Sequence, residues 1–256
     1  MRRRFATTID YLGRVELEVE RNLLELLLIM PEPHEVDRFF YADVWGPQEL
    51  AHGRILDQLQ DDLGLRPTPP VLEVGLKMKV LGALSHLGQV QDVSRLLYYL
   101  TGASTERQAV LAYSEFVKGL EQMGERAIAE TIIRPIKQQE PGHFAFYRLS
   151  AQKMIQDGEL RPWQLHFARL LRSRSYNLVG TNGMQLHKHQ MGEVIHQLGF
   201  DEQVERYAKE IGRLEANLLW AHHQGMDYPP YILEALRESV QLYRERGSFE
   251  PRENHQ

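Results

Sequence analysis

The spacing of apolar residues constrains the fold more than any other feature of this sequence. Apolar side chains recur three or four residues apart along almost the whole chain, and no convincing run of alternating, β-branched residues interrupts them. The first helical stripe contains Leu12, Glu16, Val19, Leu23, Leu26 and Met30. "PEP" at residues 31–33 ends this helix. The sequence therefore predicts an all-α protein.

Prolines and glycines divide the rest of the chain into further helices. The second helix is expected at about 34–64 and is followed by the rigid connector "RPTPP". The third is expected at about 71–123, with a possible break near Gly88, and the fourth at about 125–155. Three or four more helices reach to about Glu245.

These segments predict three regions. We expect an up-down four-helix core at 1–156 and a helical C-terminal extension, packed on that core, at 157–246. The polar end, 247–256, is expected to be a disordered tail.

Composition narrows the class of protein. Of the 256 residues, 43% are hydrophobic and 25% are charged, as is usual for a soluble globular protein. The net charge of −5 argues against a nucleic-acid partner. Cysteine is absent, which excludes thiolate chemistry. "LLELLLIM" is too short to span a membrane, and the charges at Asp10, Arg14 and Glu16 interrupt any signal peptide, so we expect a cytoplasmic protein.

Two helices carry the same Glu-x-x-His unit. "GPQELAHGRIL" contains Glu49 and His52, and "QQEPGHFAF" contains Glu140 and His143. Positions i and i+3 share a helix face, so each pair can present a carboxylate and an imidazole to one point. Iron and manganese accept this mixture of ligands. A four-helix bundle that holds two metal ions uses such a unit on two helices and a single Glu on each of the other two.

The third helix offers two candidates for its single glutamate. In antiparallel neighbours, residues at one level are about equally far from the connecting turn. Glu140 lies 16 residues beyond Gly124, and Glu106 lies 18 before it. Glu115 lies only 9 before this turn. The spacing therefore favours Glu106.

The first helix also offers two candidates. Glu49 lies 17 residues beyond the mid-turn residue Glu32, and Glu16 lies 16 before it, on the apolar stripe. An unpaired carboxylate on that stripe would be costly. Glu20, 12 residues before the turn, is the alternative.

A single Glu-x-x-His unit is also typical of a solvated helix face. A third unit, Glu193 and His196, is interpreted as incidental. Within the fourth helix, Pro141 cannot donate to the carbonyl of Lys137, so a bend or bulge is expected there, with Gly142 leaving space beside the metals.

Several segments resemble the acyl-carrier-protein desaturases, soluble members of the ferritin-like diiron superfamily. "QELAHGRIL" resembles their E-E-x-x-H-G segment, "YYLTGASTERQAVLAY" their third-helix segment and "QQEPGHFAFYRL" their D-E-x-R-H segment. "LLRSRSYNLVGTNGMQLHKHQMGEVIHQLGF" is similar to the stretch after their fourth helix. The resemblance covers about residues 10–210 and is loosest in the first helix.

The resemblance implies a ferritin-like bundle that binds two iron ions, with manganese as the other possibility. The implied ligands are terminal His52 and His143, bridging Glu49 and Glu140, and terminal Glu16 and Glu106. It implies O2-dependent oxidation with electrons from a ferredoxin-type donor, and desaturation of a fatty-acyl chain on acyl carrier protein. The alternatives are a diiron oxygenase of another small organic substrate, a ferritin-like protein without catalytic activity, and a metal-free helical interaction protein. A homodimer is expected by analogy.

The sequence departs from that family at three positions. Gln48 and Gln139 stand where the desaturases carry acidic residues, and Gly142 stands where they carry arginine. Neutral amides are expected to leave the metal-bound histidines less firmly oriented, unless acids such as Asp43 or Asp92 take over.

The implied reaction also needs a channel for the acyl chain and a docking surface for the carrier protein. An apolar channel could be lined by Phe39, Phe40, Trp45, Leu56, Tyr98, Tyr99, Phe144 and Phe146, although these residues are equally typical of a core. A docking patch for the acidic carrier protein should be basic. Its candidates are Arg169, Arg172 and Arg174, and the run Arg2, Arg3 and Arg4.

Overall fold

The computed structural model describes residues 1–248, except for the side chain of Lys77, and within them it contains helices and loops but no strand. The all-α prediction is confirmed. The helices are α1 (Arg2–Leu17), α2 (Val19–Ile29), α3 (Glu35–Phe39), η1 (Phe40–Trp45), α4 (Gly46–Asp62), α5 (Leu76–Ser85), α6 (Gly88–Gln122), α7 (Arg126–Ile128), η2 (Ala129–Ile133), α8 (Arg134–Gln156), α9 (Pro162–Ser175), α10 (Gln185–Gln197), α11 (Val204–Leu219) and α12 (Pro230–Arg246). The predicted disordered tail lies outside the described residues, apart from Gly247 and Ser248.

The first predicted helix is two helices, α1 and α2, which meet at Glu18. The backbone of Glu18 has a ψ of −3°, a turn rather than a regular helical value. Its carboxylate is buried and accepts hydrogen bonds from Arg14 at 2.5 Å and from Arg21 at 2.8 Å. The expected break before Gly88 is also present, between α5 and α6.

The second and fourth segments each contain a π-helical turn, which the apolar spacing does not indicate. In η1 the N–H of Gly46 donates to the carbonyl of Tyr41, five residues earlier. In η2 the N–H of Arg134 donates to the carbonyl of Ala129 in the same way. Each π turn rotates the following helix relative to the preceding one, and such turns occur frequently near functional sites.

Of the bend or bulge expected at Pro141, the bulge does not form. α8 stays α-helical across Pro141, and both Pro141 and Gly142 are exposed. Because Pro141 faces solvent, water can hydrogen-bond the carbonyl that the proline leaves without a donor. A Cβ on Gly142 would meet no atom within 4 Å, so this glycine opens onto solvent rather than onto the site.

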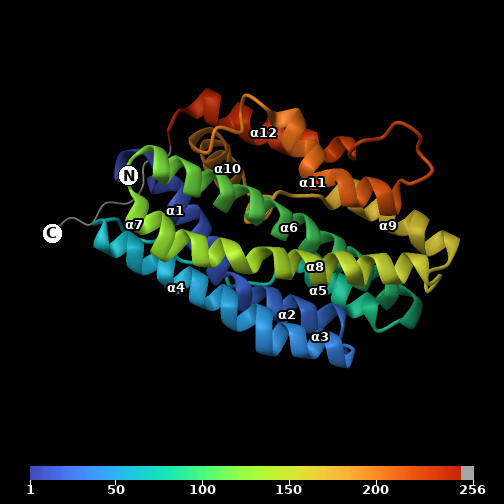
Figure 1. Cartoon of the computed structure of the whole chain (residues 1–256). Coiled ribbons are helices and arrows are strands. Elements are labelled where there is room, and N and C mark those ends of the chain that lie inside the picture. The colour runs from blue at the N-terminus through green and yellow to red at the C-terminus, as the bar shows by residue number, and fades with distance from the viewer. Residues whose placement is uncertain (249–256) are drawn as a thin grey trace.

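The long helices pack in antiparallel pairs. α1 packs on α4 and α6 packs on α8, and these helices run side by side along the molecule (Figure 1). Gly13 of α1 lies against Leu56 of α4, whereas Gly53 of α4 lies against Leu17 of α1. The two helices therefore run in opposite directions.

The core is divided into two hydrophobic clusters along the bundle. On α6, buried apolar residues within 93–103 belong to one cluster and those within 113–120 to the other. On η2 and α8, those within 147–154 and 129–136 divide in the same way. A polar layer separates the two clusters, and Glu106 and Glu140 lie in it.

The C-terminal helices cover one side of the long helices. α10 packs on α1 and α12, whereas α9 and α11 pack on α6. In Figure 1 this group lies along the upper side, away from α4. No helix in the described part of the chain is long and apolar enough to cross a membrane.

Candidate metal centre

Six buried side chains from four helices meet in the polar layer. Glu16 comes from the last turn of α1, Glu49 and His52 from α4, Glu106 from the middle of α6, and Glu140 and His143 from α8. None of the six is more than 7% exposed. The structure thus brings together all six residues that the sequence favoured as ligands.

The six residues form two overlapping groups of metal-ligand type. In the first, ligand atoms of Glu16, Glu49, His52 and Glu140 lie within 4.8 Å of one another. In the second, the same holds for Glu49, Glu106, Glu140 and His143. Glu49 and Glu140 belong to both groups, and each group has its own histidine and its own further glutamate. The arrangement could hold a metal ion in each group.

The δ-nitrogens of both histidines face the shared carboxylates. Nδ1 of His143 lies 2.9 Å from Oε1 of Glu49, and Nδ1 of His52 lies 3.4 Å from Oε1 of Glu140. Each histidine thus approaches the shared glutamate of the opposite helix more closely than the glutamate of its own helix, which for His143 is Glu140 at 3.7 Å and for His52 is Glu49 at 4.0 Å.

Several of these inward-facing atoms lack hydrogen-bond partners. Oε1 of Glu49, both carboxylate oxygens of Glu140, and Nδ1 of His52 and of His143 are buried without one. A buried polar atom without a partner is costly, and these five converge on one small volume. Bound cations would give every one of them a partner, so the residues present fit a metal site.

The charges of the layer are strongly coupled. Burial, reinforced by the charges of Glu16 and Glu106, raises the pKa of Glu49 well above its usual range, and burial likewise raises the pKa of Glu140. Burial also opposes ionisation of Glu16, but the close Glu49 carboxyl and His52 ring lower its pKa to about 2. Burial disfavours the charged ring of His143, yet Glu106 and Glu140 raise its pKa to about 10. Without cations, the layer therefore retains protons to limit its negative charge.

Two neutral donors support the two unshared glutamates. Nε1 of Trp45 donates to Glu106 at 3.0 Å, and the hydroxyl of Tyr113 donates to Glu16 at 2.5 Å. Sequence reasoning missed both roles. Tyr113 lies seven residues after Glu106, two turns along the same face of α6, which is a signal that could have found it. Trp45 ends the π turn η1, and nothing in its spacing marked it.

Each of the two glutamines contacts the histidine of the other helix. Oε1 of Gln139 on α8 lies 2.9 Å from Nε2 of His52 on α4. Oε1 of Gln48 on α4 lies 2.7 Å from Nε2 of His143 on α8. A carbonyl oxygen only accepts, so each Nε2 carries a proton and donates it. A neutral ring then has its free lone pair on Nδ1, the atom that faces the carboxylates.

Both amides thus reach the rings, so each histidine has an acceptor for its Nε2 proton. Neither acid considered as a substitute takes part. Asp43 is exposed, and Asp92 lies near Arg95 at 3.7 Å.

The remaining candidate ligands lie outside both groups. Glu20 is exposed, so the first helix contributes Glu16. Glu115 pairs with Lys118 at 2.6 Å, so α6 contributes Glu106. Of the third unit, Glu193 accepts from Gln197 and His196 lies beside Asp201.

A narrow apolar cavity adjoins the layer. It has a volume of about 70 Å³ and is lined by Glu16, Glu49 and Glu106 at one end. Most of the rest is aliphatic, including Leu12, Ala109, Met191, Leu198, Ile211 and Leu236, and the lining also includes Tyr11, Phe200, Tyr207, Thr105 and Gln108. The C-terminal helices thus complete a cavity that the long helices alone would leave open.

The aromatic residues considered for a channel do not line this cavity. Most of them pack with one another in the core on the other side of the layer; Phe40 and Phe146, for example, stack 3.6 Å apart. Phe39 is 60% exposed, and Leu56 lies in the other core cluster. The interpretation of this set as an apolar channel finds no support in the cavity lining.

One of the two candidate docking patches lies only partly at the surface, where Arg174 alone of its three arginines is exposed. Arg172 is 4% exposed and donates to Glu215 and to Thr101 inside the protein. Arg169 donates to the carbonyl of Leu219. Arg2, Arg3 and Arg4 are exposed.

The fold and the site together define a helical protein with a buried carboxylate–histidine layer suited to metal ions. No protein-family model, curated protein or solved structure matches this chain.

Proposed function

We propose that this protein is a ferritin-like diiron oxidase that acts on an apolar organic substrate with O2. The two antiparallel helix pairs, with one polar layer across all four long segments, support a ferritin-like up-down four-helix bundle. The Glu-x-x-His units of α4 and α8 and the single glutamates of α1 and α6 match the ligand set of that class.

The sharing of Glu49 and Glu140 between both groups is the observation that carries this proposal. Two carboxylates common to two ligand groups are suited to bridging two ions. The layer also has four carboxylates and two imidazoles that are neutral when they act as ligands. Two divalent cations would therefore balance its charge, which explains how so many acids can be buried together.

The chain's own residues would hold each ion with the same donor types. Glu16 and His52 would serve one ion, Glu106 and His143 the other, and Glu49 and Glu140 both. Trp45 and Tyr113 would hold the unshared carboxylates in position, and Gln48 and Gln139 would hold the rings. Two iron ions bound there would supply reduction of O2 coupled to removal of hydrogen from an unactivated C–H bond.

The overall reaction requires an external reductant. In a desaturation, one O2 takes two electrons and two protons from adjacent C–H bonds of the substrate. It takes two further electrons from a ferredoxin-type donor, with two protons from solvent, and leaves as two waters. In a hydroxylation, one oxygen atom enters the C–H bond and the other leaves as one water, with the same two external electrons and two protons.

The cavity supports an organic substrate over mere iron handling. A ferritin-like protein without catalytic activity has no need of an apolar space beside its ligands, whereas Glu16, Glu49 and Glu106 adjoin one here. Desaturation of a fatty-acyl chain on acyl carrier protein is the reaction that the family resemblance suggests. A diiron oxygenase of a smaller organic substrate is the second candidate, and it is favoured by the cavity volume of about 70 Å³.

Metal analysis of the purified full-length protein, with optical spectra during exposure of the Fe(II)-loaded protein to O2, tests the proposal. We expect about two iron ions per chain and new absorption after O2 is added. If the protein binds no transition metal, and if Glu106→Ala leaves its metal affinity unchanged, the diiron function is refuted. That result would favour a metal-free helical interaction protein.

A further inference from the structure

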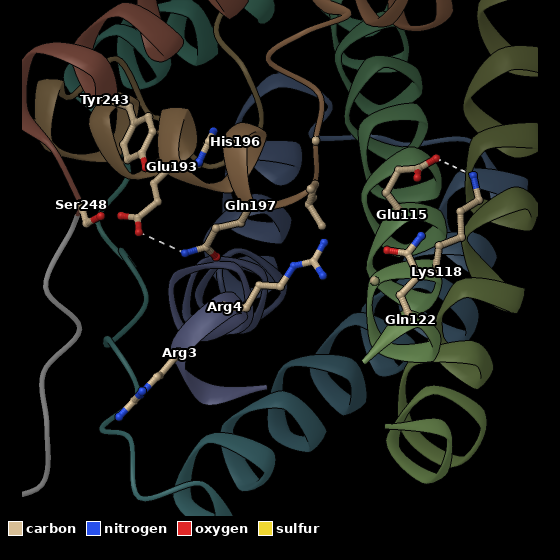
Figure 2. A pocket seen from close by; sticks show the side chains of 13 residues that line it. Arg3, Arg4, Glu115, Lys118, Gln122, Glu193, His196, Gln197, Tyr243 and Ser248 are labelled. Atoms are coloured by element: carbon tan, nitrogen blue, oxygen red, sulfur yellow. Dashed lines mark hydrogen bonds and ion pairs between the residues drawn. The ribbon is translucent and has the colours of Figure 1, made fainter. Parts of the chain in front are cut away.

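A second, larger pocket opens at the surface next to the apolar cavity. It has a volume of about 680 Å³ and lies between the first turn of α1, the last turns of α6 and the end of α10 (Figure 2). We name it the vestibule. Its lining includes the charged residues Arg3, Arg4, Glu115, Lys118 and Glu193.

The linings of the vestibule and the cavity adjoin along three helices. On α6, lining residues of the cavity within 105–112 are followed by those of the vestibule within 115–122. On α1, the vestibule is lined by Arg3 and Arg4 and the cavity by residues within 11–16. On the C-terminal side of α10, Leu198 lines both spaces. Leu198 is therefore the side chain that the two spaces have in common.

The uncompensated charge in the vestibule is positive. Its lining has three cations, Arg3, Arg4 and Lys118, against two anions, Glu115 and Glu193, and Lys118 is paired with Glu115. Arg3 and Arg4 form no ion pair within residues 1–248. A guanidinium binds a carboxylate or phosphate through two parallel hydrogen bonds, so these arginines suit an anionic group.

The lining of the vestibule is mostly polar, whereas that of the cavity is mostly apolar. The backbone of α1 rises about 18 Å between Arg4 and Glu16, at 1.5 Å per residue. The cavity at the inner end is lined mainly by aliphatic side chains. Its volume of about 70 Å³ holds on the order of five water-sized groups. A ligand that occupies both spaces must be polar at one end and apolar at the other.

We infer that the substrate is an amphipathic anion. Its carboxylate or phosphate head lies in the vestibule at Arg3 and Arg4, and its apolar end passes Leu198 into the cavity beside Glu16, Glu49 and Glu106. The inference that this ligand reacts rests on the proposed function, but its binding does not. The molecule carries its own head group, so no carrier protein is needed to deliver it.

Calorimetric titration of the full-length, metal-free protein tests the head group, with decanoate, decyl phosphate and decan-1-ol as probes. We expect at least one of the two anions to bind at least tenfold more tightly than the alcohol, and the better of them identifies the head group. The double variant Arg3→Ala/Arg4→Ala should bind that anion no better than the alcohol. Arg126→Ala, an exposed arginine outside the vestibule, is the matched control and should bind like the wild type. Equal affinity for anions and alcohol, or no effect of the double variant, would overturn the inference.

Substitutions of Leu198 test whether the ligand passes from the vestibule into the cavity. Leu198→Trp should weaken binding of all three probes at least tenfold, whereas Leu198→Ala should retain it, and circular dichroism should show both variants folded. Unchanged binding in folded Leu198→Trp would overturn the route.

The direction of the ligand can be measured with the protein loaded with Mn(II), which speeds the relaxation of nearby protons. The terminal methyl protons of decanoate should relax faster than the methylene protons beside its carboxylate, and the reverse order would overturn the inference. If no metal binds while decanoate binds through the two arginines, the diiron function fails and the amphipathic site stands. If metal binds and the arginines have no effect, only the amphipathic site fails.

Discussion

The amide oxygen of Gln48, on α4, lies 2.7 Å from Nε2 of His143, on α8, and Gln139 returns the same contact from α8 to His52 on α4. Each helix thus orients the histidine of the other. An amide oxygen accepts the hydrogen bond from Nε2–H without adding charge, so the layer has four carboxylates rather than six acids. Carboxylates often support metal-binding histidines, and in this layer neutral amides contact the two rings instead.

Removing either amide should weaken metal binding. In Gln48→Leu and in Gln139→Leu the ring loses its acceptor and can turn or change tautomer, so the dissociation constant for Fe(II) or Mn(II) should rise roughly 10- to 100-fold. Competition with a metallochromic chelator measures this. Gln138→Leu, at the exposed neighbour of Gln139, is the control. Gln48→Glu keeps an acceptor and should restore affinity, and wild-type affinity in both leucine variants would contradict the orienting role.

The two candidate glutamates of α6 should behave differently. Glu106→Gln removes a carboxylate from one ligand group and should lower the bound iron from about two ions per chain towards about one. Glu115→Gln changes only a pair with Lys118 near the surface and should leave the iron content unchanged. Plasma emission analysis of both proteins checks this. Equal iron in the two variants would remove Glu106 from the ligand set.

Stability of the metal-free protein should fall as the pH rises from about 6.5 to about 10. The pKa of His143 rises in the folded state from 6.5 to about 10, chiefly through Glu106 and Glu140 against the opposing effect of burial. Burial also raises the pKa of Glu49 and of Glu140. A group with a raised folded pKa stabilises the protein below its unfolded pKa and loses that contribution as the pH passes its folded pKa.

Thermal unfolding followed by circular dichroism measures this slope. With Mn(II) present the slope should weaken or reverse, because a bound ion takes the place of these protons. Glu16 acts at the other end of the scale, since its contribution is lost as the pH falls from 4.5 towards its folded pKa of about 2. A melting temperature of the metal-free protein that climbs between pH 6.5 and 10 would show that the layer does not retain protons.

Gly192 should be essential for the close packing of α10 against α12. A Cβ at this position would overlap the backbone carbonyl of Ser239, which cannot move aside as a flexible side chain can. Gly192→Ala should therefore lower the free energy of unfolding by roughly 1–3 kcal/mol. It should also weaken decanoate binding, since α10 lines both the cavity and the vestibule. Gly88→Ala, where a Cβ meets nothing within 4 Å, is the matched control in urea unfolding. Equal midpoints for the two variants would refute the close packing.

Local rules account for the parts of the site that could be predicted. Glu140 and His143 share a face because a helix brings positions i and i+3 together, whatever surrounds it. Glu106 and Glu140 share a level because both lie nearly equally far from the turn at Gly124. Neither rule requires knowledge of distant contacts. The π turns η1 and η2 escaped prediction because an extra residue in one helical turn leaves the apolar spacing almost unchanged.

By itself, the sequence determined that the chain is helical, which residues form the polar layer, and that Glu16 and Glu106 outrank Glu20 and Glu115. Only the tertiary structure decided what that layer faces. The cavity forms between α1, α6 and helices almost two hundred residues away, as the bond from Thr8 to Gln197 illustrates. The partner of each histidine likewise comes from another helix. Such contacts depend on how the helices pack against one another. Packing is set by the shapes of all the side chains together rather than by the spacing within any one segment.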